Sequence, residues 1–152
     1  MLKTTGYDIV FQEIPNEISL AINISNCPNR CPGCHSPYLQ QDVGEVLTLN
    51  LLSEWIDKYK DAITCVVFMG GDSDLETIYE CAVYIESTYP NLKIAQYSGR
   101  EELDKRCVEY LDFIKLGPYK KELGNLKSRT TNQRLYKIDN GQLEDITYYF
   151  HR

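Results

Sequence analysis

The sequence lacks an excess of basic residues, and it lacks any apolar run that approaches the length of a membrane span. It has 16 Lys and Arg against 22 Asp and Glu, a formal net charge of −6. Nucleic-acid binding relies on Lys and Arg that neutralise phosphates, so we expect no nucleic-acid partner. A spanning helix needs ~20 mostly apolar residues, so we expect no membrane partner. The first seven residues also lack the apolar segment of a secretory signal, and we expect a cytoplasmic protein.

The chain is short for a complete eight-fold β/α barrel. Such a barrel typically needs about 250 residues, whereas this sequence has 152. Its hydrophobic content of 43% is sufficient for a domain with a core of its own. We therefore expect residues 1–152 to form a single domain, and we expect any barrel within it to be incomplete.

Three of the six cysteines lie close together, at Cys27, Cys31 and Cys34. Prolines and a glycine lie between and after them, so no regular helix or strand runs through this stretch. Three thiolates from one loop can hold a soft metal centre. Structural zinc takes four ligands, and iron–sulfur clusters usually have four cysteines, so a fourth position is left for another ligand.

Three interpretations of this cysteine loop are open. In a zinc site, His35 or a distant cysteine would complete the tetrahedron, but His35 directly follows Cys34 and the sequence has no second Cys-x-x-Cys pair. Structural or disulfide-bonded cysteines are a second interpretation, but three clustered cysteines do not pair off among themselves. The third is an iron–sulfur cluster with three irons held by cysteine and one iron open to a small molecule. The sequence favours this third interpretation.

The remainder of the chain alternates between strand and helix patterns. Apolar runs or alternations predict strands over residues 17–24, 63–69, 92–97 and 112–116. Helical stripes follow candidate capping residues at Thr48, Ser73 and Ser98. This alternation predicts right-handed β/α crossovers and a mostly parallel sheet, with ligands at the carboxyl ends of its strands.

Further strands are expected at both ends of the sequence. Residues 7–13 precede a Pro15-Asn16 turn, which predicts a hairpin with the next strand. Residues 135–138 and 146–150 are expected to be strands joined around Asn140-Gly141, a strong turn dipeptide, and to form a C-terminal β segment. Between them, the basic stretch 117–134 has the character of a solvated loop.

Four other residues are expected to serve packing. The dispersed cysteines Cys65, Cys81 and Cys107 fall in a predicted strand or in predicted helices, where a free cysteine behaves as a small hydrophobe. Trp55 lies beside the apolar stripe of the helix predicted to follow Thr48. We expect all four side chains to belong to the core rather than to a site.

The Cys-x-x-x-Cys-x-x-Cys spacing, placed after a strand near the N-terminus, resembles the signature of the radical S-adenosylmethionine (radical SAM) enzymes. The resemblance implies an α/β fold, an incomplete radical-SAM-type β/α barrel. It also implies a catalytic [4Fe-4S] cluster whose ligands are Cys27, Cys31 and Cys34, with S-adenosylmethionine bound at the fourth iron.

Several further residues match positions that bind the cofactor in this superfamily. Gly70-Gly71-Asp72 resembles the Gly-Gly-Glu motif that engages the methionyl amino group. Asp72 is one methylene shorter than Glu. Contact of the cofactor with the backbone of Gly70 and Gly71 is therefore a firmer expectation than contact with the Asp72 side chain. His35 stands where the superfamily often has an aromatic residue near the adenine, or is a loop histidine bonded to backbone. Ser98 is implied to contact the amino acid or ribose end of the cofactor, or it caps a helix.

From the strand before Cys27 to Tyr136, the chain resembles the anaerobic ribonucleoside-triphosphate reductase activating proteins. The resemblance depends on Cys-Pro-Gly-Cys-His in the loop, Tyr-Ser-Gly at 97–99, and Asp112-Phe-Ile-Lys-Leu-Gly-Pro-Tyr followed by Thr130-Thr-Asn-Gln-Arg134. Thr131 replaces the usual Ser and keeps its hydroxyl.

This second resemblance implies an activase. A flavodoxin or ferredoxin reduces the cluster, which cleaves S-adenosylmethionine to methionine and a 5'-deoxyadenosyl radical. The radical then removes a hydrogen atom from a glycine of the large subunit of the anaerobic ribonucleoside-triphosphate reductase. An activase of another glycyl radical enzyme, or a small-molecule radical SAM enzyme, would share the cluster features and differ in residues 112–134. A small zinc-binding interaction module is the non-enzymatic alternative.

Overall fold

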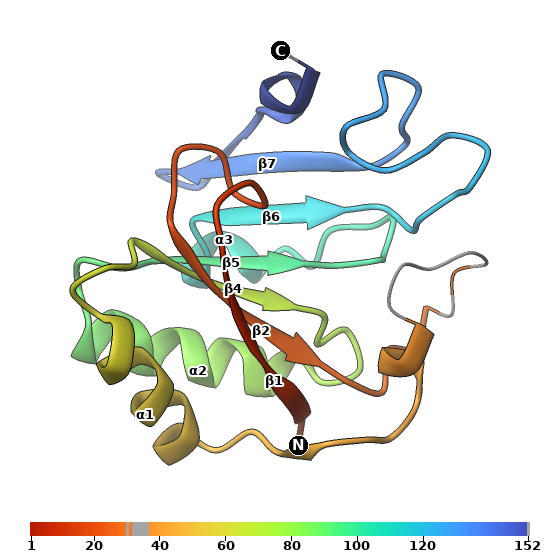
Figure 1. Ribbon diagram of the computed structural model, residues 1–152. Helices are drawn as coiled ribbons and strands as arrows, with labels where there is room; N and C mark the ends of the chain where they lie inside the picture. Colours follow the sequence, from red (N-terminus) through yellow and green to blue (C-terminus); the bar gives the residue numbers. More distant parts are fainter. Residues whose placement is uncertain (30, 32–36, 152) are drawn as a thin grey trace.

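The computed structural model describes residues 1–29, 31 and 37–151, and its main feature is one eight-stranded sheet. The strands lie in the order β3-β1-β2-β4-β5-β6-β7-β8 (Figure 1). Within the described residues, the outer strands β3 and β8 do not pair with each other, so the sheet is open and does not close into a barrel. The strand bounds are β1 (Lys3–Val10), β2 (Ser19–Ile24), β3 (Glu45–Val46), β4 (Cys65–Met69), β5 (Lys93–Tyr97), β6 (Phe113–Leu116), β7 (Arg134–Asp139) and β8 (Gln142–Asp145).

Within the part of the chain that the structure describes, three α-helices and two short 3-10 helices accompany the sheet. They are α1 (Leu49–Tyr59), α2 (Leu75–Thr88), α3 (Cys107–Tyr110), η1 (Pro37–Gln40) and η2 (Thr147–His151). The side chain of Thr48 caps α1, as predicted, by accepting a hydrogen bond from the amide of Leu51 at 3.1 Å. The cap of α2 is Asp74 rather than Ser73. Within the described part of the chain, no helix is both long enough and apolar enough to cross a bilayer.

The prediction of a mostly parallel sheet is wrong. The central strands β2, β4, β5 and β6 pair in parallel, but four of the seven pairings, those at the two flanks, are antiparallel. Parallel neighbours need a long crossover, which the chain provides only between β2 and β6. The predicted hairpin at the N-terminus is confirmed, since β1 pairs with β2 around the Pro15-Asn16 turn.

Two predictions for the C-terminal half of the chain are also wrong. No helix follows Ser98 directly, because Asp104 accepts hydrogen bonds from the backbone and guanidinium of Arg106 and holds an irregular turn there. Only the short α3 comes after it. The partner of β7 is β8, not residues 146–150, because a two-residue turn at Asn140-Gly141 pairs Asp139 directly with Gln142. Residues 147–151 form η2 instead.

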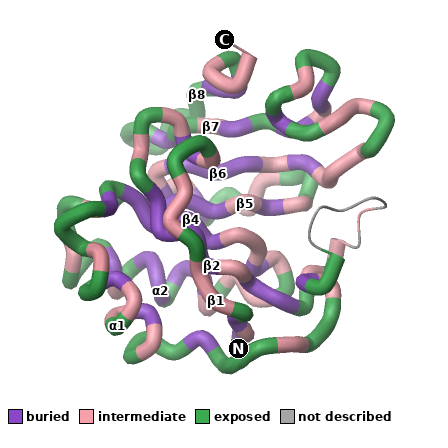
Figure 2. The backbone as a smooth tube through the Cα atoms, in the orientation of Figure 1, coloured by how far each residue is buried: buried purple, intermediate pink, exposed green. Residues whose placement is uncertain are grey.

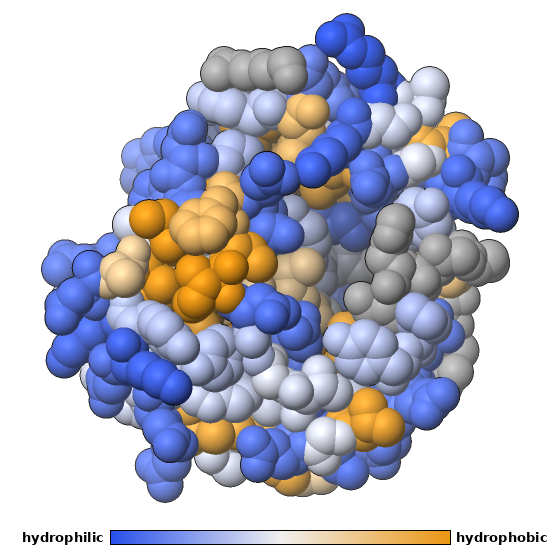
Figure 3. All heavy atoms as spheres, viewed as in Figure 1, coloured by the Kyte–Doolittle hydropathy of each residue, from blue (hydrophilic) through white to orange (hydrophobic). Residues whose placement is uncertain are grey.

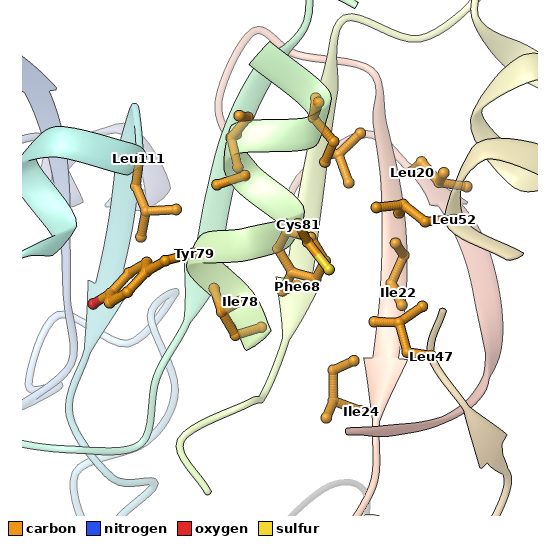
Figure 4. Packing of buried hydrophobic residues seen from close by; sticks show 14 of the residues in the cluster. Leu20, Ile22, Ile24, Leu47, Leu52, Phe68, Ile78, Tyr79, Cys81 and Leu111 are labelled. Atoms are coloured by element: carbon orange, nitrogen blue, oxygen red, sulfur yellow. The ribbon is translucent and has the colours of Figure 1, made fainter. Parts of the chain in front are cut away.

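The central strands are buried on both faces (Figure 2). Along β4, Val66 and Phe68 face the helices, whereas Cys65 and Val67 face the opposite side. The helix-side core joins these residues to β2, α1 and α2, as the side chains of Leu20, Ile22, Leu52 and Ile78 show (Figure 4). The second core lies under the β1–β2 connection and the C-terminal segment, with Ile14, Ile146 and Phe150 packed on the sheet.

The packing residues predicted from sequence lie where expected. Cys65, Cys81 and Cys107 are buried free thiols. Trp55 packs against the helix-side core, with its ring centroid 4.9 Å from that of Tyr7. The face in Figure 3 has an apolar patch over the β1–β2 connection, where the side chain of Phe11 is 66% exposed. That patch lies away from the carboxyl ends of the parallel strands, which meet at one edge of the sheet (Figure 1).

Candidate metal centre

The cysteine loop leaves the sheet at the carboxyl end of β2 and returns through η1. Two backbone hydrogen bonds close its base: the amide of Asn26 donates to the carbonyl of Gln41 at 2.9 Å, and the amide of Cys27 donates to that of Leu39 at 2.8 Å. The side chain of Leu39 is buried. The two ends of the loop are therefore held together, and the buried Leu39 anchors the returning end in the protein.

Two of the three predicted cluster ligands are described. Cys27 and Cys31 are free and half-buried. Cys34 and His35 lie outside the described residues, and among the described residues alone no three His, Cys, Asp or Glu side chains converge as a metal site. The predicted triad is thus placed only in part, with two thiols at the carboxyl edge of the parallel strands.

Asn29 connects this loop to the neighbouring strands. Its Nδ2 lies 3.6 Å from Sγ of Cys27 and 2.7 Å from Oδ2 of Asp72. The same side chain lies against the backbone of Gly99, because a Cβ added there would be 2.6 Å from Nδ2 of Asn29. The cysteine loop therefore touches the segments that follow both β4 and β5. Asn29 was not predicted from the sequence, in which its position between two candidate ligands is the only signal for it.

The Asp72 carboxylate is the centre of a polar network. Its Oδ1 accepts hydrogen bonds from Oγ of Ser98 at 2.7 Å and Nε2 of Gln96 at 3.5 Å. Its Oδ2 accepts from the amide of Gly99 at 2.9 Å and from Asn29 at 2.7 Å. A carboxylate offers about four lone-pair sites, so protein donors occupy them all in this structure. The structure thus brings together Asp72 and Ser98, both predicted as cofactor-binding residues.

Gly70 and Gly71 give the turn after β4 its shape. Their φ angles are +121° and +101°, in a region that favours glycine. A Cβ on Gly70 would lie 3.2 Å from the carbonyl oxygen of Ile24, and one on Gly71 would lie 2.5 Å from Cδ1 of Ile78. The two glycines therefore let the turn approach both the end of β2 and the start of α2. This approach places Asp72 beside the cysteine loop.

Lys115 fastens the ends of β5 and β6 together. Its side chain is mostly buried, and its ammonium donates to the carbonyls of Ser98 at 3.1 Å and Gly117 at 2.8 Å. The ammonium also lies 5.7 Å from the ring centroid of Tyr97. A role for Lys115 was not predicted from the sequence. The available signal was a lysine within a four-residue strand that is otherwise apolar.

A cavity of about 400 Å³ opens at this same edge, on the face of the sheet opposite α1 and α2. Its walls include Met69, Tyr97, Lys115, Leu126, Gln133 and Phe150. Burial raises the pKa of Tyr97 far above its ordinary value, so its hydroxyl stays protonated and donates to the carbonyl of Glu13. The volume is in the range of sites that take small ligands.

The basic stretch 117–134 forms one wall of the cavity and is less solvated than predicted. Leu126, Thr131 and Gln133 are buried. The reason is local hydrogen bonding: Thr131 donates to the carbonyl of Gly124 at 3.3 Å, and Gln133 donates to that of Gly117 at 3.4 Å. These bonds satisfy the polar groups that burial would otherwise leave unpaired.

The donors at the loop suit an iron–sulfur cluster. Thiol sulfurs are the ligands that such clusters take, and an N–H aimed at a ligand sulfur, as Asn29 provides for Cys27, is a common supporting contact around them. The buried cysteines differ, because burial raises the pKa of Cys65 to about 12 and those of Cys81 and Cys107 to about 11. Those thiols stay protonated and unsuited to metal binding at neutral pH.

Comparison with known proteins agrees with this chemistry. Residues 18–138 match the model of a protein family described as a 4Fe-4S single cluster domain, which is typical of radical SAM-related proteins. No curated protein and no solved structure matches the chain. The matched span contains all three loop cysteines, and it favours the iron–sulfur interpretation over zinc and over disulfides. Because the match covers well over half of the sequence, the chain belongs to the 4Fe-4S single cluster domain family.

Proposed function

We propose that this protein is a radical SAM activase that installs a glycyl radical on the anaerobic ribonucleoside-triphosphate reductase. The observation that carries the proposal is the contact between the cysteine loop and the Asp72–Ser98 network, next to an open cavity. Membership of the 4Fe-4S family supports the cluster. The Tyr-Ser-Gly turn and the 112–134 segment, which both border this edge, support the choice of partner by their resemblance to the reductase activators.

In this proposal Cys27, Cys31 and Cys34 hold three irons of the cluster and leave the fourth for S-adenosylmethionine. When bound, the reduced cluster supplies the one-electron cleavage of S-adenosylmethionine to methionine and a 5'-deoxyadenosyl radical. The backbone of Gly70 and Gly71 would orient the methionyl end of the cofactor. Ser98 would contact its amino acid or ribose end, and His35 is the residue proposed for the adenine.

The cavity on the face opposite α1 and α2 is the proposed entry for the partner's glycine-containing segment. The open sheet suits a protein substrate, since a chain segment needs a path to the radical that a closed barrel would narrow. Tyr97 and Phe150 line this cavity and give it apolar walls. A flavodoxin or ferredoxin is the proposed source of the electron.

The test begins with anaerobic reconstitution using iron and sulfide. Electron paramagnetic resonance of the reduced protein is then recorded with and without S-adenosylmethionine, and afterwards with the purified large reductase subunit. We expect a [4Fe-4S]+ signal that changes on adding the cofactor, and then a glycyl radical signal on the reductase. A cofactor-sensitive cluster that yields no glycyl radical would refute the choice of partner. Zinc at one per chain, without iron or sulfide, would refute the radical mechanism altogether.

A further inference from the structure

We propose that Asn29 and Asp72 are a positioning pair that fastens the cysteine loop to the ends of β4 and β5, and that the second amide hydrogen of Asn29 raises the reduction potential of the cluster held by Cys27. The inference rests on the iron–sulfur part of the proposed function and is independent of its cofactor and partner. In this inference Asp72 acts on the cluster indirectly, by positioning Asn29.

The orientation of the Asn29 amide follows from its neighbours. Nδ2 carries two hydrogens, and its two partners, Oδ2 of Asp72 at 2.7 Å and Sγ of Cys27 at 3.6 Å, are both acceptors. Rotating the amide by 180° would place Oδ1 against a carboxylate and a sulfur, which have no hydrogen to donate when ionised. One hydrogen therefore goes to each partner.

Asp72 holds this arrangement from the side of the sheet. Its other donors are Ser98, Gly99 and Gln96, of which Ser98 and Gln96 are 4% and 1% exposed. These donors belong to β5 and the turn after it, so they fix the carboxylate independently of the loop. Asn29 then docks on a preformed acceptor, and the loop acquires a defined distance from the strand ends.

Gly99 is the third residue that positions the Asn29 side chain. A Cβ at this position would lie 2.6 Å from Nδ2 and 2.9 Å from Cγ of Asn29. The φ of Gly99 lies outside the left-handed region that favours glycine, so alanine there meets no strain of that kind. A Gly99→Ala substitution therefore pushes against the Asn29 side chain specifically, while leaving Asn29 itself in the chain.

The expected consequence is electrochemical. Reduction adds negative charge to a cluster and its ligand sulfurs, and hydrogen bonds to those sulfurs stabilise the reduced state. Loss of the bond from Asn29 to Cys27 therefore makes the cluster harder to reduce. An asparagine that served only to fill space would leave the potential unchanged.

The experiment is a redox titration of the reconstituted cluster, monitored by electron paramagnetic resonance without S-adenosylmethionine or reductase. We compare the wild-type protein with Asn29→Ala and Gly99→Ala, and with Ser73→Ala as a control. Ser73 is exposed and adjacent to Asp72 but takes no part in its hydrogen bonds. We expect more negative midpoint potentials in the first two variants and the wild-type potential in the third.

An unchanged midpoint potential in Asn29→Ala would overturn the inference. If that variant does not retain iron and sulfide, Gly99→Ala decides: a negative shift supports the inference, and the wild-type value refutes it. Because the titration uses neither cofactor nor partner, it stands even if the activase function fails. Absence of any cluster in the wild-type protein would refute both proposals.

Discussion

Nδ2 of Asn29 lies 2.7 Å from Oδ2 of Asp72, although the two residues are 43 positions apart in the chain. Asn29 belongs to the loop after β2, and Asp72 belongs to the turn after β4. Because Asp72 also binds Ser98 and Gly99 after β5, the ends of three neighbouring parallel strands meet in one network. The carboxyl edge of a parallel sheet is where ligand sites usually form, and here the network gives that edge its shape.

The first prediction concerns the ligands of the cluster. Cys27→Ala, Cys31→Ala and Cys34→Ala should each abolish cleavage of S-adenosylmethionine, because each removes one of the three proposed protein ligands. The measurement is product formation by chromatography, together with iron and sulfide content after reconstitution. Retained cleavage in any one of the three variants would contradict the assignment.

Cys81→Ala is the matched control for those variants. Its sulfur packs in the helix-side core, 2% exposed, so the substitution removes a small apolar contact and no ligand. We expect full cluster content, with a loss of about 1 kcal/mol in the free energy of unfolding.

The second prediction concerns thiol reactivity in the protein without its cluster. Burial raises the pKa of Cys81 and Cys107 to about 11. A raised thiol pKa means that the reactive thiolate forms only as the pH approaches that value. Even at pH 9 only about one thiol in a hundred is ionised, and at lower pH the fraction is smaller still. Mass spectrometry after brief iodoacetamide treatment at pH 8 should find these two cysteines unmodified and the half-buried Cys27 and Cys31 alkylated.

Two controls frame the alkylation experiment. In urea all cysteines should react, which shows that the protection comes from folding. Reconstitution with iron and sulfide should protect Cys27 and Cys31 as well. Alkylation of Cys81 at pH 8 in the folded protein would contradict the burial on which the prediction is based.

Much of the fold was predictable because its signals are local. The continuous apolar run of β4 and the cap at Thr48 depend on neighbours within a few residues, and both predictions are confirmed. The Asn140-Gly141 turn was also correctly located, but the strand after it was misplaced. A two-residue turn sets the register at once, so the exposed segment β8 pairs with β7 despite its weak apolar pattern.

The site was predictable in its chemistry but not in its connections. The sequence singled out Asp72 and Ser98 separately, one as a cofactor contact and the other as a contact or a helix cap. Their mutual hydrogen bond depends on the register of β4 against β5, where Met69 pairs with Tyr97. No pattern in one chain segment carries that information. Asn29 and Lys115 were missed for the same reason. Each donates a hydrogen bond to a residue that follows a different strand: Asn29 to Asp72 after β4, and Lys115 to Ser98 after β5.

The third prediction concerns the turn after β4. Gly71→Ala should lower the free energy of unfolding by about 1–3 kcal/mol through backbone strain, and further through the clash of its Cβ with Ile78. Gly141→Ala is the matched control, because Gly141 also has a positive φ, +76°, but nothing lies within 4 Å of its added Cβ. Chemical denaturation of both variants measures the difference. Equal losses in the free energy of unfolding would show that α2 accommodates the new methyl group without further destabilisation.

The fourth prediction concerns the proposed interface with the reductase. Deleting residues 127–134 would remove the buried Thr131 and Gln133 and damage the fold, so a single exposed charge is the better probe. Lys121 is exposed within the basic stretch beside the cavity wall. If this stretch meets an acidic surface of the reductase, Lys121→Glu should weaken binding roughly fivefold at low salt, equivalent to about 1 kcal/mol, and less as salt increases.

Lys58→Glu, on α1, makes the same charge change outside this stretch and should bind as the wild type does. Surface plasmon resonance with the large subunit at two salt concentrations measures both variants. Equal weakening by the two substitutions would point to net charge alone, whereas unchanged binding in both would remove the basic stretch from the interface.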